Sequence, residues 1–366
     1  MKYILLSVIA LFLLTCCTNC KKDSPEPIQE TTELAFGGDL SIIKKLEDYG
    51  AVYKVDGIQK KGLQIFKENN YTWIRLRIFH TPNNEGPVCN SLSYTIELAK
   101  EAKQLGYKIL LDFHYSDTWA DPGKQFTPAA WENLAFNVLA DSVKLYTTRV
   151  LNSMGNAGVL PEMVQVGNEI NNGMLWPYGK LYSDTGVTNW KGLTDLVKAG
   201  VQGVKDASGG SAIKIMIHAA TGGNKTESET FYKEMIEYGV NFDVIGLSYY
   251  PWWHGTFDQL ESNLQNLSSK FAREISVVET AYYANNWYPA PDKWTLDVQP
   301  YPPTEQGQND FLVELATRIK KHPSVKTVFY WEPETVDIPE SKIFYLGRSL
   351  FDKQGNAFKG ISAWKE

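Results

Sequence analysis

Eight short apolar runs alternate with longer amphipathic stretches along this chain, and this alternation restricts the possible folds most strongly. The runs occupy residues 34–40, 71–79, 107–115, 162–169, 213–220, 242–250, 274–280 and 326–333. Such runs are typical of parallel strands that are buried on both faces. Stretches such as 93–107, 139–158 and 304–322 have the periodicity of helices with one apolar face. Eight strand–helix units of roughly 40 residues predict an α/β fold, a single (β/α)8 TIM barrel over residues 34–366.

An open, doubly wound α/β sheet is the alternative fold. Its first strand is typically followed by a GxGxxG turn, and the "FGGDLS" stretch at residues 36–41 matches that pattern poorly. Neither an internal repeat nor a second domain boundary is visible. The barrel is therefore favoured, and it places any catalytic residues at the C-terminal ends of its strands.

The first 33 residues have a different character from the body of the chain. Lys2 and an apolar run to Leu14 indicate a signal peptide at residues 1–20, and the charged, proline-containing stretch 21–33 indicates a flexible linker. Three cysteines after the apolar run resemble a bacterial lipoprotein processing site: Cys16, Cys17 and Cys20. We expect an exported protein that is lipid-anchored to the bacterial outer membrane at the cell surface; an ordinary secretory signal is the alternative.

Composition excludes several classes of partner and chemistry. The net charge of -6 gives no indication of nucleic-acid binding. Cys89 is the only cysteine after residue 20, so no disulfide can form within the body, and no metal-ligand spacing, P-loop or GxSxG elbow occurs. We therefore expect no cofactor and no metal, a membrane contact only through the lipid anchor, and a monomer.

Polar residues recur where the predicted strands end. They are Arg75, Arg77, Asp112, His114, Tyr115, Asn168, Glu169, His218, Tyr249, Tyr250, Glu279, Trp331 and Glu332. A polar rim accounts for any one of these residues but accounts poorly for the whole set. The set therefore predicts a functional site at the barrel mouth.

Glu169 and Glu279 end the fourth and seventh predicted strands, so both can project into one pocket. Two carboxyl groups on either side of a bond are what glycoside hydrolysis requires. One must be protonated to assist the leaving oxygen, and the other must be ionised to attack the anomeric carbon. Arg75 is the predicted partner of Glu279, because a nearby cation favours the ionised form.

Longer motifs at these strands resemble glycoside hydrolase family 53, the endo-β-1,4-galactanases of clan A. They are "DFHYSDTWADP" (112–122), "GNEINNGMLWP" (167–177), "IMIH" (215–218), "SYYP" (248–251), "VVET" (277–280) and "FYWEP" (329–333). The match extends in register from about residue 35 to about 335 over most of the body. The eleven-residue motifs are far more specific than "VVET" alone.

The resemblance implies a role for each matching residue. Glu169 is the implied general acid/base and Glu279 the implied nucleophile, in a retaining endo-hydrolysis of β-1,4-galactosidic bonds. Tyr250 is implied to bond the nucleophile, Asn168 the sugar 2-hydroxyl, and Trp331 to lie under the sugar, with a cis peptide after it. The expected substrate-binding set is Arg75, Asp112, His114, Trp119, Asn168, Trp176, His218, Tyr250 and Trp331. Among these, Asp112 has the character of a structural hydrogen-bond acceptor, and His218 occupies a position that commonly contacts the nucleophile or sugar.

Two alternatives and one departure from the family remain. The same glutamates could serve a mannanase or xylanase, or the barrel could be a non-catalytic glycan-binding protein. Some family members carry a calcium loop after the seventh strand. Here that loop, 281–306, has only two Asp and is rich in Trp, Tyr and Pro, which disfavours a calcium site.

Overall fold

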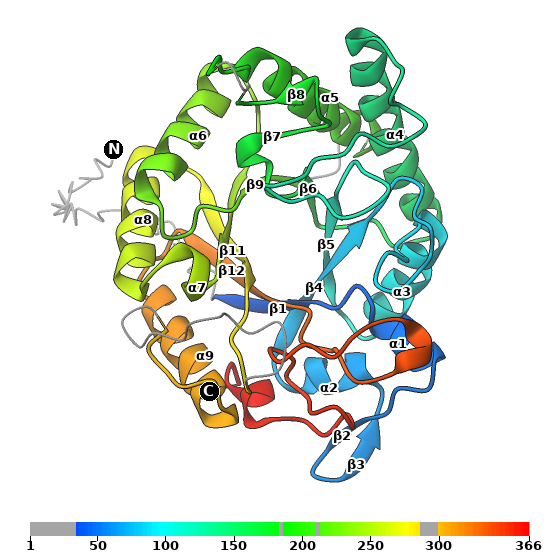
Figure 1. The fold of residues 1–366 in the computed structure, drawn as a ribbon, viewed down its shortest axis with the longest axis vertical. Helices are drawn as coiled ribbons and strands as arrows, with labels where there is room; N and C mark the ends of the chain where they lie inside the picture. Colours follow the sequence, from blue (N-terminus) through cyan, green and yellow to red (C-terminus); the bar gives the residue numbers. More distant parts are fainter. Residues whose placement is uncertain (1–33, 183–185, 209–212, 286–298, 366) are drawn as a thin grey trace, which may run out of the picture. The chain divides into compact units, whose positions relative to one another are not determined.

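The computed structural model describes residues 34–182, 186–208, 213–285 and 299–365, and it confirms the predicted barrel. Eight parallel strands close in the order β1-β12-β11-β10-β9-β6-β5-β4 (Figure 1). Their bounds are β1 Ala35–Asp39, β4 Tyr71–Ile78, β5 Lys108–Phe113, β6 Met163–Val166, β9 Lys214–Ala219, β10 Val244–Tyr249, β11 Glu274–Thr280 and β12 Val325–Trp331. Each predicted apolar run contains or closely overlaps one of these strands.

Helices surround the barrel and bury their apolar faces against the outside of its strands (Figure 1). They are α1 Ile43–Asp48, α2 Gly62–Glu68, α3 Leu92–Gln104, α4 Phe136–Asn156, α5 Trp190–Ser208, α6 Lys225–Glu237, α7 Pro251–His254, α8 Phe257–Lys270 and α9 Glu305–Ile319. Short 3-10 turns are η1 Ile170–Asn172, η2 Pro339–Ser341 and η3 Lys359–Ser362. In the described part of the chain, no helix has both the length and the apolar character needed to cross a membrane.

Two small hairpins lie outside the barrel and were not predicted. β2 (Tyr53–Val55) and β3 (Ile58–Lys60) are joined by Asp56 and Gly57, whose φ angles of 51° and 75° suit the two-residue turn of a hairpin. β7 (Gly173–Met174) and β8 (Gly179–Lys180) form the second hairpin, directly after η1. Strands of two or three residues are too short to give a periodic signal in the sequence.

The interior of the barrel is apolar at one level. It is filled there by a cluster of seven buried side chains: Trp73, Leu110, Met163, Met216, Val244, Val278 and Phe329. Gly37 on β1 makes room for this cluster, because a Cβ atom there would lie 2.6 Å from the Phe329 ring. Well-packed side chains at this level make a solid floor beneath the barrel mouth.

The next level toward the strand C-termini is polar. Two residues after each inward-facing apolar side chain, the strand again faces inward, so Trp73 is followed by Arg75, Leu110 by Asp112, and Met216 by His218. Arg75, Asp112 and His218 are at most 1% exposed. Buried polar groups of this kind must satisfy one another, and their network supports the mouth of the barrel.

The predicted signal peptide, lipidation cysteines and linker lie at residues 1–33, outside the described residues. These assignments therefore stay predictions.

Candidate active site

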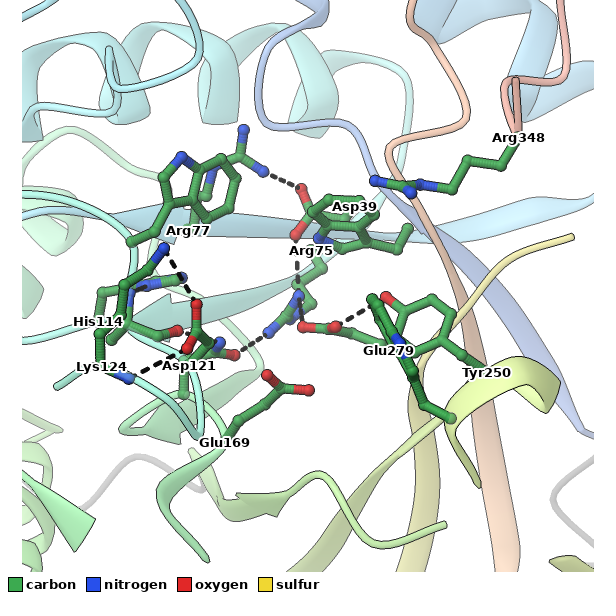
Figure 2. A pocket seen from close by; sticks show the side chains of 15 residues that line it. Asp39, Arg75, Arg77, His114, Asp121, Lys124, Glu169, Tyr250, Glu279 and Arg348 are labelled. Carbon is green, nitrogen blue, oxygen red and sulfur yellow. Dashed lines mark hydrogen bonds and ion pairs between the residues drawn. The ribbon is translucent and has the colours of Figure 1, made fainter. Parts of the chain in front are cut away.

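A cavity of about 250 Å³ opens among the C-terminal ends of the strands (Figure 2). It is lined by Asp39, Arg75, Arg77, His114, Trp119, Ala120, Asp121, Lys124, Asn168, Glu169, Tyr250, Trp253, Glu279, Trp331 and Arg348. Eight of the eleven predicted site residues are in this set. The polar strand ends therefore converge on one cavity, as the barrel predicted.

Arg75 on β4 lies beneath the cavity and pairs with several buried carboxylates. Its Nη1 lies 2.8 Å from Glu279 and 2.9 Å from Asp39, while Nη2 lies 2.9 Å from Asp112. Burial opposes the charge of the guanidinium, but Asp112, Glu279 and Asp39 outweigh burial and raise its pKa. Arg75 is therefore a permanent cation under the cavity, and its predicted contact with Glu279 is present.

Glu279 on β11 is held at both oxygens. Oε1 pairs with Arg75, and Oε2 accepts a 2.8 Å hydrogen bond from the Tyr250 hydroxyl (Figure 2). Burial raises the pKa of Glu279, whereas Arg75 and the Tyr250 hydroxyl oppose that rise because both favour the carboxylate. This carboxylate is fixed in place by two partners that favour its ionised form against the effect of burial.

Glu169 follows β6 and has a different environment. Its φ and ψ of 49° and 50° lie in the left-handed region, after Gly167 with φ of 85°. This tight turn lifts the half-buried side chain into the cavity, a conformation that costs free energy in a residue with a Cβ. Burial and the negative charge of Glu279 raise the pKa of Glu169 to about 8. Of the two glutamates, Glu169 is the one that holds a proton near neutral pH.

The two carboxyl groups lie close enough to act on one bond. One oxygen of Glu169 and one oxygen of Glu279 are within 4.8 Å of each other. An oxygen–oxygen distance of at most 4.8 Å is compatible with the retaining mechanism, in which the carboxyl groups lie about 5–5.5 Å apart, and fits poorly the roughly 6.5–9.5 Å that inverting enzymes keep to admit water. The pair is suited to double displacement at an anomeric carbon.

Asn168 connects the pair to the network below. Its Oδ1 accepts hydrogen bonds from Arg75 at 2.8 Å and from Gln165 at 3.0 Å, and its Nδ2 donates to the Ala120 carbonyl at 2.9 Å. One amide hydrogen of Nδ2 then remains for a ligand in the cavity that Asn168 lines. This geometry accommodates the sugar contact implied by the family resemblance.

Three predicted substrate-binding residues are absent from the described lining of the cavity: Asp112, Trp176 and His218. Asp112 is fully buried, and burial alone would raise its pKa, but Arg75 and His114 outweigh burial and lower it. Asp112 is therefore an ionised partner that supports Arg75. His218 is also fully buried, and no hydrogen bond joins it to Glu279 within the described structure.

Aromatic and guanidinium groups form another part of the cavity wall. Trp119 and Trp331 lie with ring centroids 6.1 Å apart. The Arg77 guanidinium covers the Trp119 ring at 4.2 Å, and the Arg348 guanidinium covers the Trp331 ring at 4.3 Å. A cation held against a ring fixes its orientation. The indole faces thus provide a rigid surface for the C–H face of a sugar.

Five lining residues were not singled out from the sequence: Asp39, Ala120, Asp121, Lys124 and Arg348. Asp39 ends β1 and could have been found by the strand-end rule that found the others. Arg348 lies in a loop beyond the last strand, where no period signals its position. The cis peptide that the resemblance implied after Trp331 is not present; in the described chain, the cis bond is Trp176–Pro177.

Glu169, His218 and Glu279 could in principle hold a metal ion, since one ligand atom from each lies within 4.8 Å of the others. The histidine does not fit this role. Nε2 of His218 lies 2.8 Å from the Ser248 hydroxyl, and Nδ1 lies 3.1 Å from Gln165 Nε2, so both ring nitrogens are engaged within the protein. The arrangement is a hydrogen-bond network around a carboxylate pair. For the loop 281–306, residues 286–298 fall outside the described part, so its lack of a calcium site stays a prediction.

Comparison with known proteins identifies the family. The model of glycosyl hydrolase family 53 matches residues 35–364. An uncharacterized protein of Niallia circulans is 39% identical, covering 90% of this chain and 93% of its own. An arabinogalactan endo-β-1,4-galactanase of Humicola insolens is 32% identical over 90% of this chain and 98% of its own. The solved family 53 catalytic domain of Ignisphaera aggregans is 33% identical with a TM-score of 0.83, covering 93% and 98% of the two chains. The chain belongs to glycosyl hydrolase family 53.

Proposed function

We propose that this protein hydrolyses internal β-1,4-galactosidic bonds of pectic galactan and arabinogalactan with retention of anomeric configuration. The observation that carries the proposal is the close pair of glutamates in unlike environments at the barrel mouth. The proposed substrate class, β-1,4-galactan, is supported by family membership and by similarity to arabinogalactan endo-β-1,4-galactanases.

In the first step, Glu169 donates its proton to the oxygen of the leaving sugar, while the carboxylate of Glu279 attacks the anomeric carbon. Arg75 and Tyr250 hold Glu279 in the ionised form needed for attack. The galactosyl–enzyme ester then meets water, from which Glu169, now ionised, removes a proton as water attacks the same carbon. Two inversions give net retention, and Glu169 recovers its proton.

Product analysis on β-1,4-galactan tests the proposal. We expect early release of a mixture of oligosaccharides, as internal cleavage requires, and proton NMR of the newly formed reducing ends should first show the β anomer. Initial formation of the α anomer would contradict the retaining mechanism. Release of oligosaccharides from mannan or xylan, with galactan untouched, would select the alternative specificities. Binding of galactan without hydrolysis would select a glycan-binding barrel.

The two unlike glutamates predict the pH dependence of kcat/KM. Glu279 must be ionised and its pKa is raised, so activity on the acidic side should set in above the ordinary carboxyl range of about 4.3. Glu169 must be protonated, so activity should fall as the pH rises through about 8. Initial rates at low substrate concentration between pH 4 and 10 measure both limbs. An alkaline limb below pH 6 would contradict the raised pKa of Glu169.

We further propose that the protein is an exported monomer, lipid-anchored to the outer membrane through Cys16, Cys17 or Cys20. Support comes from the cysteines that directly follow the apolar run of residues 3–14. The full-length protein should enter the detergent phase of Triton X-114 and lose this behaviour when the lipidated cysteine is replaced by alanine. Light scattering of the soluble body tests the monomer.

A further inference from the structure

Ser248 on β10 makes the one side-chain hydrogen bond to the Glu169 carboxyl group within the described structure. Its hydroxyl lies 2.6 Å from Oε1 of Glu169, and the serine is fully buried. Oε2 has no hydrogen-bond partner among the described residues, and Glu169 projects into the cavity (Figure 2). The two oxygens of the carboxyl group are therefore in different surroundings.

The direction of this hydrogen bond follows from the groups behind Ser248. Burial, reinforced by Arg75, lowers the pKa of His218 well below its usual value, so the ring is neutral and carries one N–H. Nδ1 of His218 faces the main-chain N–H of Glu169 at 3.3 Å, which can only donate, and the Gln165 amide nitrogen at 3.1 Å, whose two hydrogens are shared with Asp112 and Asn168. Nδ1 therefore accepts, and the proton lies on Nε2, which faces the Ser248 oxygen at 2.8 Å.

Asn168 does not change this assignment. Its Oδ1 lies 3.0 Å from Nδ1 of His218, but it already receives hydrogens from Arg75 and Gln165. Because Nε2–H of His218 occupies the Ser248 oxygen as a donor, the serine hydrogen is directed away from His218 and toward Oε1 of Glu169. A donor held on Oε1 leaves Oε2 as the site for the catalytic proton.

We propose that Ser248, oriented by His218, is a positioning residue that directs the acid/base proton of Glu169 to Oε2, the oxygen that faces the substrate. The inference rests on the proposed function of Glu169 as acid/base. The bond has a second consequence, because a donor to the carboxylate favours its ionised form and limits how far the pKa of Glu169 can rise. Ser248 thereby lowers the pH at which activity is lost on the alkaline side.

The other groups that act on Glu169 stay in place when this serine is changed. Glu279 on β11 and Asp121 after β5 raise the pKa of Glu169, and Arg75 on β4 lowers it. Tyr250 after β10 also faces the pair, and His218 on β9 is neutral. Of these groups only His218 contacts the Ser248 hydroxyl, so a serine variant changes the hydrogen bonds to Glu169 and His218 and leaves the charged groups in place.

Ser248→Ala is the direct test. Removing the donor should move the alkaline limb of the kcat/KM profile upward by about one pH unit, which corresponds to loss of one hydrogen bond to the charged form. The acidic limb should stay in place, because it reports Glu279. At pH 6, kcat should fall by about tenfold or more, since the proton is no longer confined to Oε2. An alkaline limb that stays in place or moves downward would overturn the proposal.

Two further variants separate positioning from a loss of folding. Ser276→Ala is the matched control, since Ser276 is a buried serine on β11 whose hydroxyl bonds Thr327 and no carboxylate. Both limbs of the kcat/KM profile of Ser276→Ala should coincide with those of the wild type. Ser248→Cys replaces the hydroxyl by a somewhat larger thiol that is a weaker donor, so the alkaline limb of its pH profile should lie between those of the wild type and Ser248→Ala. If Ser248→Ala does not fold, the cysteine variant decides.

A measurement without substrate keeps this inference distinct from the proposed function. Carbon-13 NMR of protein labelled at the glutamate carboxyl carbons gives the pKa of Glu169 directly, with the signal assigned by its loss in Glu169→Gln. The pKa should rise by about one unit in Ser248→Ala. A protein inactive on galactan would refute the proposed function while this titration still tests the hydrogen bond.

Discussion

Replacement of Glu279 by alanine is expected to abolish hydrolysis of galactan, with kcat lowered at least about 10⁴-fold. No other carboxylate can replace it. Asp112 is fully buried and paired with Arg75, and Asp39, although it lines the cavity, is held by ion pairs with Arg75 and Arg77. Initial rates on galactan measure the loss. Residual activity within tenfold of the wild type would rule out Glu279 as the nucleophile.

Azide identifies the role of Glu279 chemically. In Glu279→Ala, an azide ion can occupy the vacated space beside Arg75 and attack the anomeric carbon of an aryl β-galactobioside, while Glu169 protonates the departing phenol. The expected product is the α-galactobiosyl azide, formed by one inversion. Glu274→Gln is the matched control, because Glu274 lies on the same strand β11 but is partly exposed and pairs with Lys214 at the opposite end. The Glu274→Gln substitution should change kcat by less than about twofold.

Replacement of Glu169 by glutamine is expected to lower kcat on galactan by roughly 10²- to 10⁴-fold, the usual contribution of a general acid. The loss should depend on the leaving group. A sugar alcohol leaves poorly without a proton, whereas 2,4-dinitrophenolate needs none. The first step on 2,4-dinitrophenyl β-galactobioside should therefore proceed at nearly the wild-type rate, and a burst of dinitrophenol should precede slow turnover. Equal losses on both substrates would contradict the acid/base role.

Glu169→Gln should also lose the alkaline limb of its pH profile, because the group with a pKa near 8 is gone.

Azide gives a result for Glu169→Ala that complements the one for Glu279→Ala. In Glu169→Ala, azide should attack the galactosyl–enzyme and yield the β-galactobiosyl azide. Glu162→Gln provides a matched control. Glu162 precedes β6 and pairs with Lys103, remote from the cavity. Thermal melting of both variants confirms that each has folded.

The barrel could be predicted because buried parallel strands leave a strong pattern. Each of the eight runs is apolar enough to be covered on both faces, and the stretches between them have the helical period. Elements that depend on few residues gave no such pattern. The β2–β3 hairpin depends on the turn at Asp56 and Gly57, and the β7–β8 hairpin has only two residues in each strand.

The sequence predicted those residues of the candidate site that lie at or near the ends of barrel strands. Glu169, Glu279, Arg75 and Tyr250 are each near the end of a barrel strand, and all four line one cavity. Arg348 could not be found in this way, because it lies in the irregular segment after β12, where no period signals its position.

The sequence by itself determined which residues face inward, since side chains alternate along a strand with a period of two. It thereby placed the polar groups at one end of the barrel. Tertiary structure decided which of them are partners. His218 is paired with Ser248, which bonds Glu169, while Asp112 is paired with Arg75. Such pairings depend on strand register and on the turn that lifts Glu169, and both are set by contacts between segments far apart in the chain.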